Sequence, residues 1–165
     1  MKRKRTIYIL LLLGLLQGCQ RAILRGDIHK VTGINSSKIS LEESYDVFAG
    51  FSEEYTFEKY KLSKDEVQKF IRKQQKLLPN NAKWKQLNWT LTPIDTSYSE
   101  IEVMVLNFTS SKNLSRELEK MSMILKQPGN YYSFYYWPDI NDPRKVQFFL
   151  LDVHENRIYA IDARY

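Results

Sequence analysis

The chain has 165 residues, the length of one ordinary domain with a substantial interior, and aromatic residues make up 13% of it. Its formal net charge of +6 comes mainly from residues 2–5, Lys-Arg-Lys-Arg, because the rest of the chain holds 21 basic and 19 acidic side chains. Residues 20–165 contain no run of basic residues, so we expect no nucleic-acid partner. The only cysteine is Cys19, which excludes a disulfide within the chain.

The first nineteen residues have the three parts of an export signal. A basic start at 2–5 is followed by an apolar run of ten residues, Ile7 to Leu16, and then by Gln17-Gly18-Cys19. A signal peptide combines a basic start, about 7–15 apolar residues and a small residue before the cleavage point. A membrane-spanning helix needs about 20 apolar residues, so this run is too short to cross a bilayer.

The four residues Leu16-Gln17-Gly18-Cys19 resemble the lipobox of bacterial lipoprotein precursors. The resemblance implies cleavage between Gly18 and Cys19, removal of residues 1–18, and lipid attached to the sulfur and the new amine of Cys19. Gln17 departs from the pattern, which usually has Ala or Ser there. Several acyl chains on one residue anchor a protein stably, whereas one binds only marginally. By the family's sorting tendency, Gln20 implies an outer-membrane location facing the periplasm.

Residues 19–43 are expected to form the lipidated N-terminus and a tether. Turn-forming residues occur at Arg25-Gly26-Asp27, Gly33 and Asn35-Ser36-Ser37, and the apolar residues between them show no clean period. A flexible tether of this length spans roughly 27 Å on average. The alternative, which the sequence leaves open, is that part of this segment packs on the domain as an irregular arm.

Residues 44–165 are predicted to form a single α+β domain. Ser63-Lys64-Asp65-Glu66 is a capping box that begins a helix, and Pro79 ends this helix. Apolar patterning predicts four strands in this part of the chain, at 45–51, 55–57, 87–91 and 101–108.

The last third of the domain is the richest in strand-forming residues. A second helix begins at Asn113 and ends at Pro128-Gly129. Glu155-Asn156 is expected to be a two-residue turn that places Val153 opposite Ile158. The three strands predicted here are 131–137, 146–153 and 157–163. The order ββαββαβββ predicts a mainly antiparallel sheet with two helices packed on one face.

No segment of the sequence indicates a catalytic residue, a metal ligand or a cofactor site. His154-Glu155-Asn156-Arg157-Ile158 begins like a zinc-protease motif, but its fifth residue is Ile and supplies no second ligand. Asp139, Asn141 and Asp142 lack the alternate spacing and central glycine of a calcium-binding loop. We therefore predict no metal and no cofactor.

The aromatic strand 131–137 is the candidate binding surface. Alternation places Tyr131, Tyr135 and Trp137 on one side of the strand and Tyr132 and Tyr136 on the other. One side is expected to face the helices, and the other would present amphipathic rings to a protein or to cell-wall sugars. The alternative is a central strand that is covered on both faces.

The sequence thus favours a non-enzymatic envelope lipoprotein whose domain binds another macromolecule. Its partners are the membrane, through lipid on Cys19, and a protein or cell-wall component. An immunity or inhibitor role and a role as subunit of an envelope complex both fit. The alternative is an enzyme acting on the cell wall or another periplasmic substrate, which predicts a concave site with convergent polar groups and perturbed carboxylates.

Overall fold

The computed structural model describes residues 24–48, 53–73, 77, 83–108 and 111–165. Within them, six strands form one sheet in the order β1-β2-β6-β5-β4-β3, and every neighbouring pair is antiparallel. The strands are β1 (Ile39–Phe48), β2 (Glu54–Leu62), β3 (Lys85–Leu91), β4 (Tyr131–Pro138), β5 (Pro143–Asp152) and β6 (Arg157–Arg164). The helices are α2 (Arg25–Thr32), α3 (Lys64–Arg72), α4 (Ser99–Leu106) and α5 (Lys112–Lys126), with short 3-10 turns η1 (Ser36–Lys38) and η2 (Thr96–Tyr98).

The α+β class agrees with the structure, but the predicted order ββαββαβββ with two helices is wrong. The described residues form four α-helices, and the segment 101–108, expected to be a strand, belongs mostly to α4. Its β-branched residues Ile101, Val103 and Val105 favour strands. Its buried residues Ile101, Met104 and Val105 instead follow the three-to-four-residue spacing of a helix. Burial against the sheet outweighs local propensity here.

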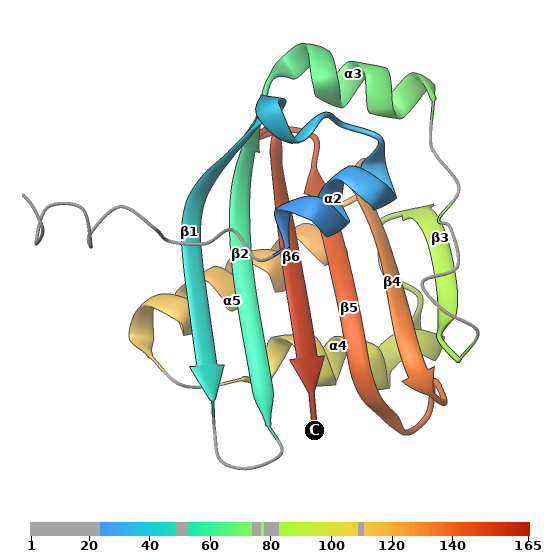
Figure 1. Cartoon of the computed structure of the whole chain (residues 1–165). Coiled ribbons are helices and arrows are strands. Elements are labelled where there is room, and N and C mark those ends of the chain that lie inside the picture. The colour runs from blue at the N-terminus through green and yellow to red at the C-terminus, as the bar shows by residue number, and fades with distance from the viewer. Residues whose placement is uncertain (1–23, 49–52, 74–76, 78–82, 109–110) are drawn as a thin grey trace, which may run out of the picture.

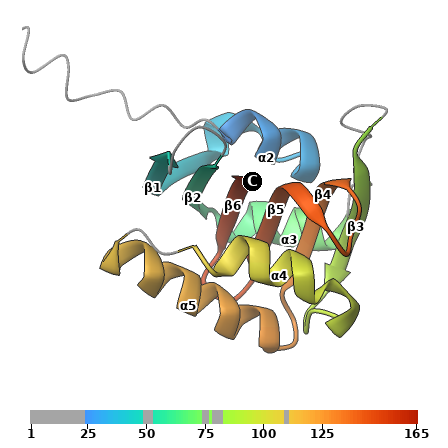
Figure 2. The ribbon, with the colours of Figure 1, turned by 90° about the horizontal axis from the view of Figure 1, so that it is seen from below.

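Helices cover both faces of the sheet, and the prediction of helices on one face is therefore also wrong. Helices α4 and α5 lie on one face and α2 lies on the other, as Figures 1 and 2 show. Val67 and Phe70 of α3 share a core cluster with Ile28 of α2. Within β5, Phe148 packs in the α4–α5 cluster and Phe149 in the α2–α3 cluster, and both are buried. A strand that is apolar on both sides needs cover on both sides.

Much of the predicted tether 19–43 is folded, because Leu24 and helix α2 pack on the sheet and residues 39–43 belong to β1. Leu24, Ile28 and Val31 are at most 3% exposed, and their i, i+4, i+7 spacing is the period of a helix face. Gly33, at φ 72°, ends α2 in the left-handed conformation that favours glycine. The predicted domain start at 44 falls inside β1, while residues 19–23 lie outside the described part of the chain.

A buried carboxylate fixes the start of α2 to the sheet. Glu58 of β2 is 0% exposed, and its Oε2 accepts hydrogen bonds from the Leu24 N–H, at 2.8 Å, and from the Tyr60 hydroxyl. Burial, together with Glu58, raises the pKa of Tyr60 well above its ordinary value, so the hydroxyl stays protonated and donates. Near the other end of the helix, Trp89 Nε1 donates to the Val31 carbonyl at 2.8 Å.

Replacing Glu58 with leucine is expected to lower the free energy of unfolding by about 1–3 kcal/mol, because two buried donors lose their acceptor. Chemical denaturation measures the loss, and amide exchange should rise across α2. The matched control is Glu54→Leu on the same strand, where the carboxylate is half exposed and pairs with Arg164. Its change should stay below about 1 kcal/mol. Equal losses in the two variants would contradict this role for Glu58.

A bulge in β1 reverses the side to which its residues point. The pairing of β1 with β2 shifts between Leu41 and Glu43. Leu41 therefore packs with the α2–α3 cluster, whereas Tyr45 packs with the α4–α5 cluster. Glu43 is turned toward α5 by the same shift, and there it meets Lys59 of β2.

The turn between β5 and β6 is longer than predicted. Leu151, rather than Val153, pairs with the residue Ile158, so the predicted two-residue turn is wrong. Four residues, 153–156, connect the strands, and Asn156 adopts a positive φ of 51°. Asparagine tolerates this left-handed conformation better than most residues, which explains its place at the end of the turn.

Candidate functional site

The aromatic residues of the candidate binding surface lie on β4, which has β3 on one side and β5 on the other. Tyr132 is 1% exposed and Tyr135 is 5% exposed, so these two belong to the interior rather than to a surface. Tyr131 is partly buried against Phe70 of α3, with the ring centres 5.7 Å apart. Alternate residues of a strand point to opposite faces, and here each face is covered.

Tyr136 and Trp137 remain partly exposed at the end of β4. Lys85 Nζ, from β3, lies 5.8 Å from the centre of the Tyr136 ring. Lys145 Nζ, from β5, lies 6.0 Å from the centre of the Trp137 ring. Both distances are those of cation–π contacts. Tyr136 and Trp137 are consecutive in β4 and point to opposite faces of the sheet, so each ring pairs with a lysine on its own face. The two pairs together are called the aromatic–lysine cluster below.

The two lysines of the cluster did not emerge from the sequence. Lys145 stands directly opposite Trp137 in the β4–β5 ladder, so pairing these two strands across their connecting loop would have found it. Lys85 stands opposite Tyr136 in the β3–β4 ladder, which joins segments far apart in the chain. No pattern within one short segment of the sequence indicates the pairing of β3 with β4.

One carboxylate accompanies the cluster. Asp139, in the loop after β4, forms an ion pair with Lys85 at 3.3 Å, and both side chains are 54% exposed. The backbone N–H of Asn141, and then Lys85, lower the pKa of Asp139, so its carboxylate is ionised at neutral pH. Each pair thus combines a partly exposed ring with a cation at the end of β4, which suits a partner that presents apolar and acidic side chains.

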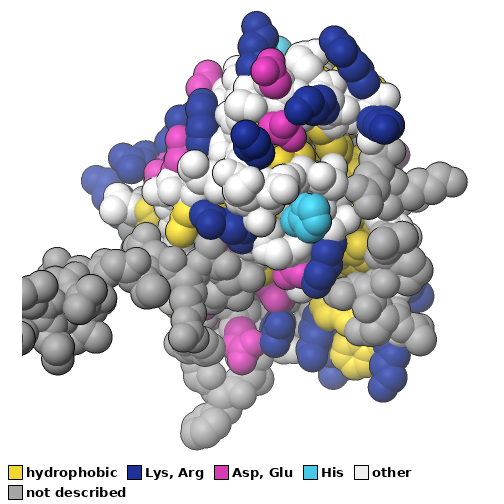
Figure 3. Space-filling view, turned by 45° about the horizontal axis from the view of Figure 1, so that its top comes forward, with side chains coloured by type: hydrophobic (Ala, Val, Ile, Leu, Met, Phe, Trp, Pro, Cys, Tyr) yellow, Lys and Arg dark blue, Asp and Glu magenta, His cyan; other side chains and the backbone are white. Residues whose placement is uncertain are grey.

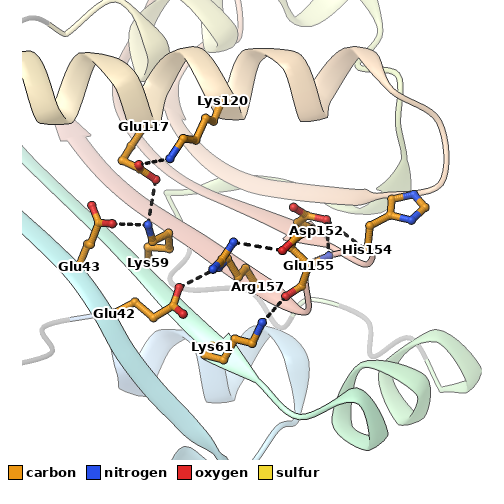
Figure 4. Close-up of polar contacts among 10 residues, drawn as sticks. All are labelled: Glu42, Glu43, Lys59, Lys61, Glu117, Lys120, Asp152, His154, Glu155 and Arg157. Atoms are coloured by element: carbon orange, nitrogen blue, oxygen red, sulfur yellow. Dashed lines mark hydrogen bonds and ion pairs between the residues drawn. The ribbon is translucent and has the colours of Figure 1, made fainter.

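A second polar centre joins β1, β2 and α5 (Figure 4). Lys59 Nζ of β2 bonds to Glu43 of β1 and lies 3.0 Å from Oε2 of Glu117 on α5. The other oxygen of Glu117 accepts from Lys120, at 2.5 Å. The side chains of Lys59 and Glu117 are 8% and 1% exposed, whereas those of Glu43 and Lys120 reach solvent. We call these four residues the Lys59 network.

The two buried members of the Lys59 network, Lys59 and Glu117, both stay charged at neutral pH. Burial lowers the pKa of Lys59, but hydrogen bonds to Glu43 and Glu117 outweigh this effect and raise it above its ordinary value. Burial likewise raises the pKa of Glu117, and hydrogen bonds from Lys120 and Lys59 more than reverse this, so it is lowered. A lysine held protonated has no free electron pair, so Lys59 is not suited to act as a nucleophile or general base. The network is a structural connection between sheet and helix.

The histidine of the zinc-protease-like segment lies in the β5–β6 turn (Figure 4). Asp152 Oδ1 accepts from the backbone N–H groups of His154 and Glu155, each at 3.0 Å. Arg157 pairs with Glu42 at 2.8 Å and with Glu155 at 3.3 Å. The acidic and basic groups of this segment therefore hold the turn and the strand ends together.

One hollow of the described surface, of about 520 Å³, lies between the end of α4 and α5, and the ionisable side chain among its described lining residues is Glu119. Its other described lining residues are Leu106, Asn107, Phe108, Ser115, Leu118 and Ser122. This lining offers one carboxylate and several hydroxyl and amide groups beside apolar side chains.

Across the described ranges, no three His, Cys, Asp or Glu side chains are grouped so that they could bind a metal ion. No helix in the part of the chain that the structure describes is long and apolar enough to cross a bilayer. Gly18 and Cys19, the predicted cleavage and lipidation residues, lie outside the described residues.

No family model, curated protein or solved structure matches the chain. The chemistry of its own residues therefore carries any functional proposal. Two features stand out on that basis: the first nineteen residues, and the aromatic–lysine cluster at the end of β4.

Proposed function

We propose that this chain is a lipid-anchored protein of the bacterial envelope, held through Cys19 at the outer membrane and facing the periplasm. The observation that carries the proposal is the order of a basic start at 2–5, an apolar run from Ile7 to Leu16, and a lipobox-like ending at Cys19. Every helix and strand that the structure describes lies after the proposed cleavage point, since the first of them, α2, begins at Arg25. Several acyl chains at one residue then anchor the domain stably.

The domain in this proposal binds a protein partner through the aromatic–lysine cluster. Tryptophan and tyrosine are enriched where interfaces gain most of their energy, because their rings bury a large area at little entropic cost. Lys85 and Lys145 stand over those rings and would meet acidic side chains of the partner. Both an immunity or inhibitor protein and a subunit of an envelope complex would use such a surface.

Purification of the protein from detergent-solubilised envelopes tests both halves of the proposal. Intact-mass measurement should give the chain from Cys19 with its acyl groups, and a free thiol or a retained leader would contradict the anchor. Co-purifying proteins then separate the two roles. One stoichiometric toxin-like or hydrolase-like partner supports immunity or inhibition, and a multi-protein assembly supports a structural subunit.

Trp137→Ala is expected to weaken partner binding by about 2 kcal/mol, or roughly thirtyfold in dissociation constant, because the exposed ring is the largest apolar group of the cluster. The measurement is titration of the captured partner against the purified variant. Met123→Ala, on the exposed side of α5 where the side chain is 57% exposed, is the control and should bind as the parent does. Unchanged affinity in Trp137→Ala would move the binding surface elsewhere.

A further inference from the structure

The distance between the predicted lipid and the fold is short. Leu24 is 3% exposed and is held by Glu58, so the chain is fixed to the sheet from this residue on. Cys19 precedes Leu24 by five residues, which span at most about 18 Å when fully extended. The headgroup layer of a bilayer takes about 5–8 Å of that reach. The remaining gap is about one helix diameter, roughly 10–12 Å.

Helix α2 is the first element after the anchor, so its face of the sheet is the one that the short connection holds nearest the bilayer. Figure 2 shows α2 on one side of the sheet and α4 and α5 on the far side. Seating α4 and α5 on the membrane would place the sheet between the lipid and Leu24. A connection of five residues is too short to pass around a six-stranded sheet whose strands lie about 4.8 Å apart.

The two faces of the sheet also differ in charge, and the face that carries α2 and α3 is the more positive one. Residues 24–38 and 63–73, which form α2, η1 and α3, hold seven basic and three acidic side chains, a net charge of +4. Residues 99–126, which form α4 and α5, hold four of each. The whole chain after residue 18 is only +2, so the positive charge is gathered on the α2–α3 face. Figure 3 shows Lys and Arg side chains spread over this part of the surface.

Most of these cations are available to a ligand. The side chains of Lys30 and Lys69 are 69% and 70% exposed, although each has one acidic neighbour on its own helix. Four more are exposed and form no ion pair with a described carboxylate; they are Lys38, Lys64, Arg72 and Lys73. The seventh, Arg25, is partly buried. Anionic phospholipids attract basic residues close to a membrane surface, and the attraction fades within a Debye length. The short connection keeps this face inside that range.

We propose that the α2–α3 face lies against the membrane, with its lysines and arginines on the phosphates of anionic phospholipids. This inference rests on the proposed lipid anchor and deepens it, because it fixes the orientation of the domain. At the end of β4 away from α3, Trp137 and Lys145 then lie on the α2 side of the sheet and Tyr136 and Lys85 on the α4–α5 side, so a protein partner would bind at that end of the sheet. Helices α4 and α5 face away from the bilayer, toward the periplasm.

Lysine footprinting on vesicles tests the orientation with internal controls. The native acylated protein is reconstituted in vesicles of phosphatidylglycerol and phosphatidylcholine, or of phosphatidylcholine alone, and lysine acetylation rates are read by mass spectrometry. Rates at the lysines of the α2–α3 face should fall at least threefold in the anionic vesicles. Those lysines are Lys30, Lys38, Lys64, Lys69 and Lys73. Lys112 and Lys126 on α5 should react equally in both vesicles.

Protection should disappear in Lys69→Glu/Lys73→Glu and at high salt, whereas Lys112→Glu/Lys126→Glu should keep it. Equal rates on the two faces, or protection of the α5 lysines, would overturn the orientation. Protection of the α2–α3 face that persists in detergent without lipid would instead indicate a second copy or a protein partner, and would also overturn it. If intact mass shows an unmodified Cys19, the anchor proposal fails separately. A maleimide lipid coupled to Cys19 of the chain from residue 19 then provides the same connection, and the footprint still decides the orientation.

Discussion

The Cys19→Ser variant is expected to lose lipid attachment completely and to accumulate as the uncleaved precursor of 19.6 kDa. A thiolate is the reactive species in sulfur chemistry, and a serine hydroxyl is far weaker as a nucleophile without an activating base. Lipid transfer at position 19 therefore stops, and cleavage that requires the lipidated residue stops with it. Intact mass and labelling with an acyl-chain analogue measure both effects.

Gln17→Ala is the matched control for this experiment. It changes the one residue of Leu16-Gln17-Gly18-Cys19 that departs from the lipobox pattern, so acylation and cleavage should proceed at least as well as in the parent. Normal processing and normal membrane retention of Cys19→Ser would show that the lipobox assignment is wrong. The orientation proposed for the α2–α3 face would then lose its physical cause.

The second large effect is expected in the Lys59 network. Lys59→Met should lower the free energy of unfolding by about 3–5 kcal/mol, because it leaves the buried Glu117 carboxylate and Glu43 without their shared cation. Denaturant unfolding at neutral pH measures the loss. Lys85→Met removes a lysine from the half-exposed pair with Asp139 and should leave the unfolding midpoint unchanged.

A double variant separates the charge effect from lost packing. Lys59→Met/Glu117→Leu removes both buried charges together, and Glu43 and Lys120 can turn to solvent because their side chains are 32% and 44% exposed. The double variant should regain most of the free energy of unfolding that Lys59→Met loses, since a buried ion pair can often be replaced by apolar groups. A double variant less stable than the single one would contradict this account.

The pH dependence of the Lys59→Met effect follows from the two shifted groups. The pKa of Glu117 is depressed below its ordinary value of 4.5, so its contribution to stability is present above that pH and is lost as pH falls through the lowered pKa. The pKa of Lys59 is raised above 10.5, so its contribution is present below that pH and is lost only as pH rises through the raised value. The difference between parent and variant should therefore be constant at neutral pH and shrink in acid.

Several elements were predictable because their signals are local. The Ser63 cap of the predicted capping box was confirmed, since Ser63 Oγ accepts from the Glu66 N–H at 3.3 Å, whereas the Glu66 side chain accepts from Lys69 at 2.8 Å. The apolar stripe of the second predicted helix was also correct, and its members are at most 3% exposed in α5. They are Leu114, Leu118, Met121 and Leu125. Caps and helical stripes depend on residues within one or two turns, and the chain carries that information in a single segment.

The candidate site was predicted only in part, because exposure depends on what packs above a strand. The sequence indicated an aromatic strand at 131–137, and β4 is that strand. Which of its rings stay accessible is decided by α3, whose Phe70 meets Tyr131, and by η2, whose Tyr98 meets Phe134. A bulge in β3, between Leu87 and Thr90, adds a second non-local effect. It places Leu87 in the α4–α5 cluster and Trp89, two residues later, in the α2–α3 cluster.

By itself, the sequence determined the α+β class and the helices that have strong caps or stripes, and the proposed export signal and lipid attachment at Cys19 rest on it alone. Only the tertiary structure decided that residues 25–32 are a helix on the sheet, that 101–106 are helical, and that both faces are covered. The physical reason is the range of the forces involved. Caps and periodicity act between residues close in the chain, whereas burial depends on surfaces that come together only when the sheet has formed.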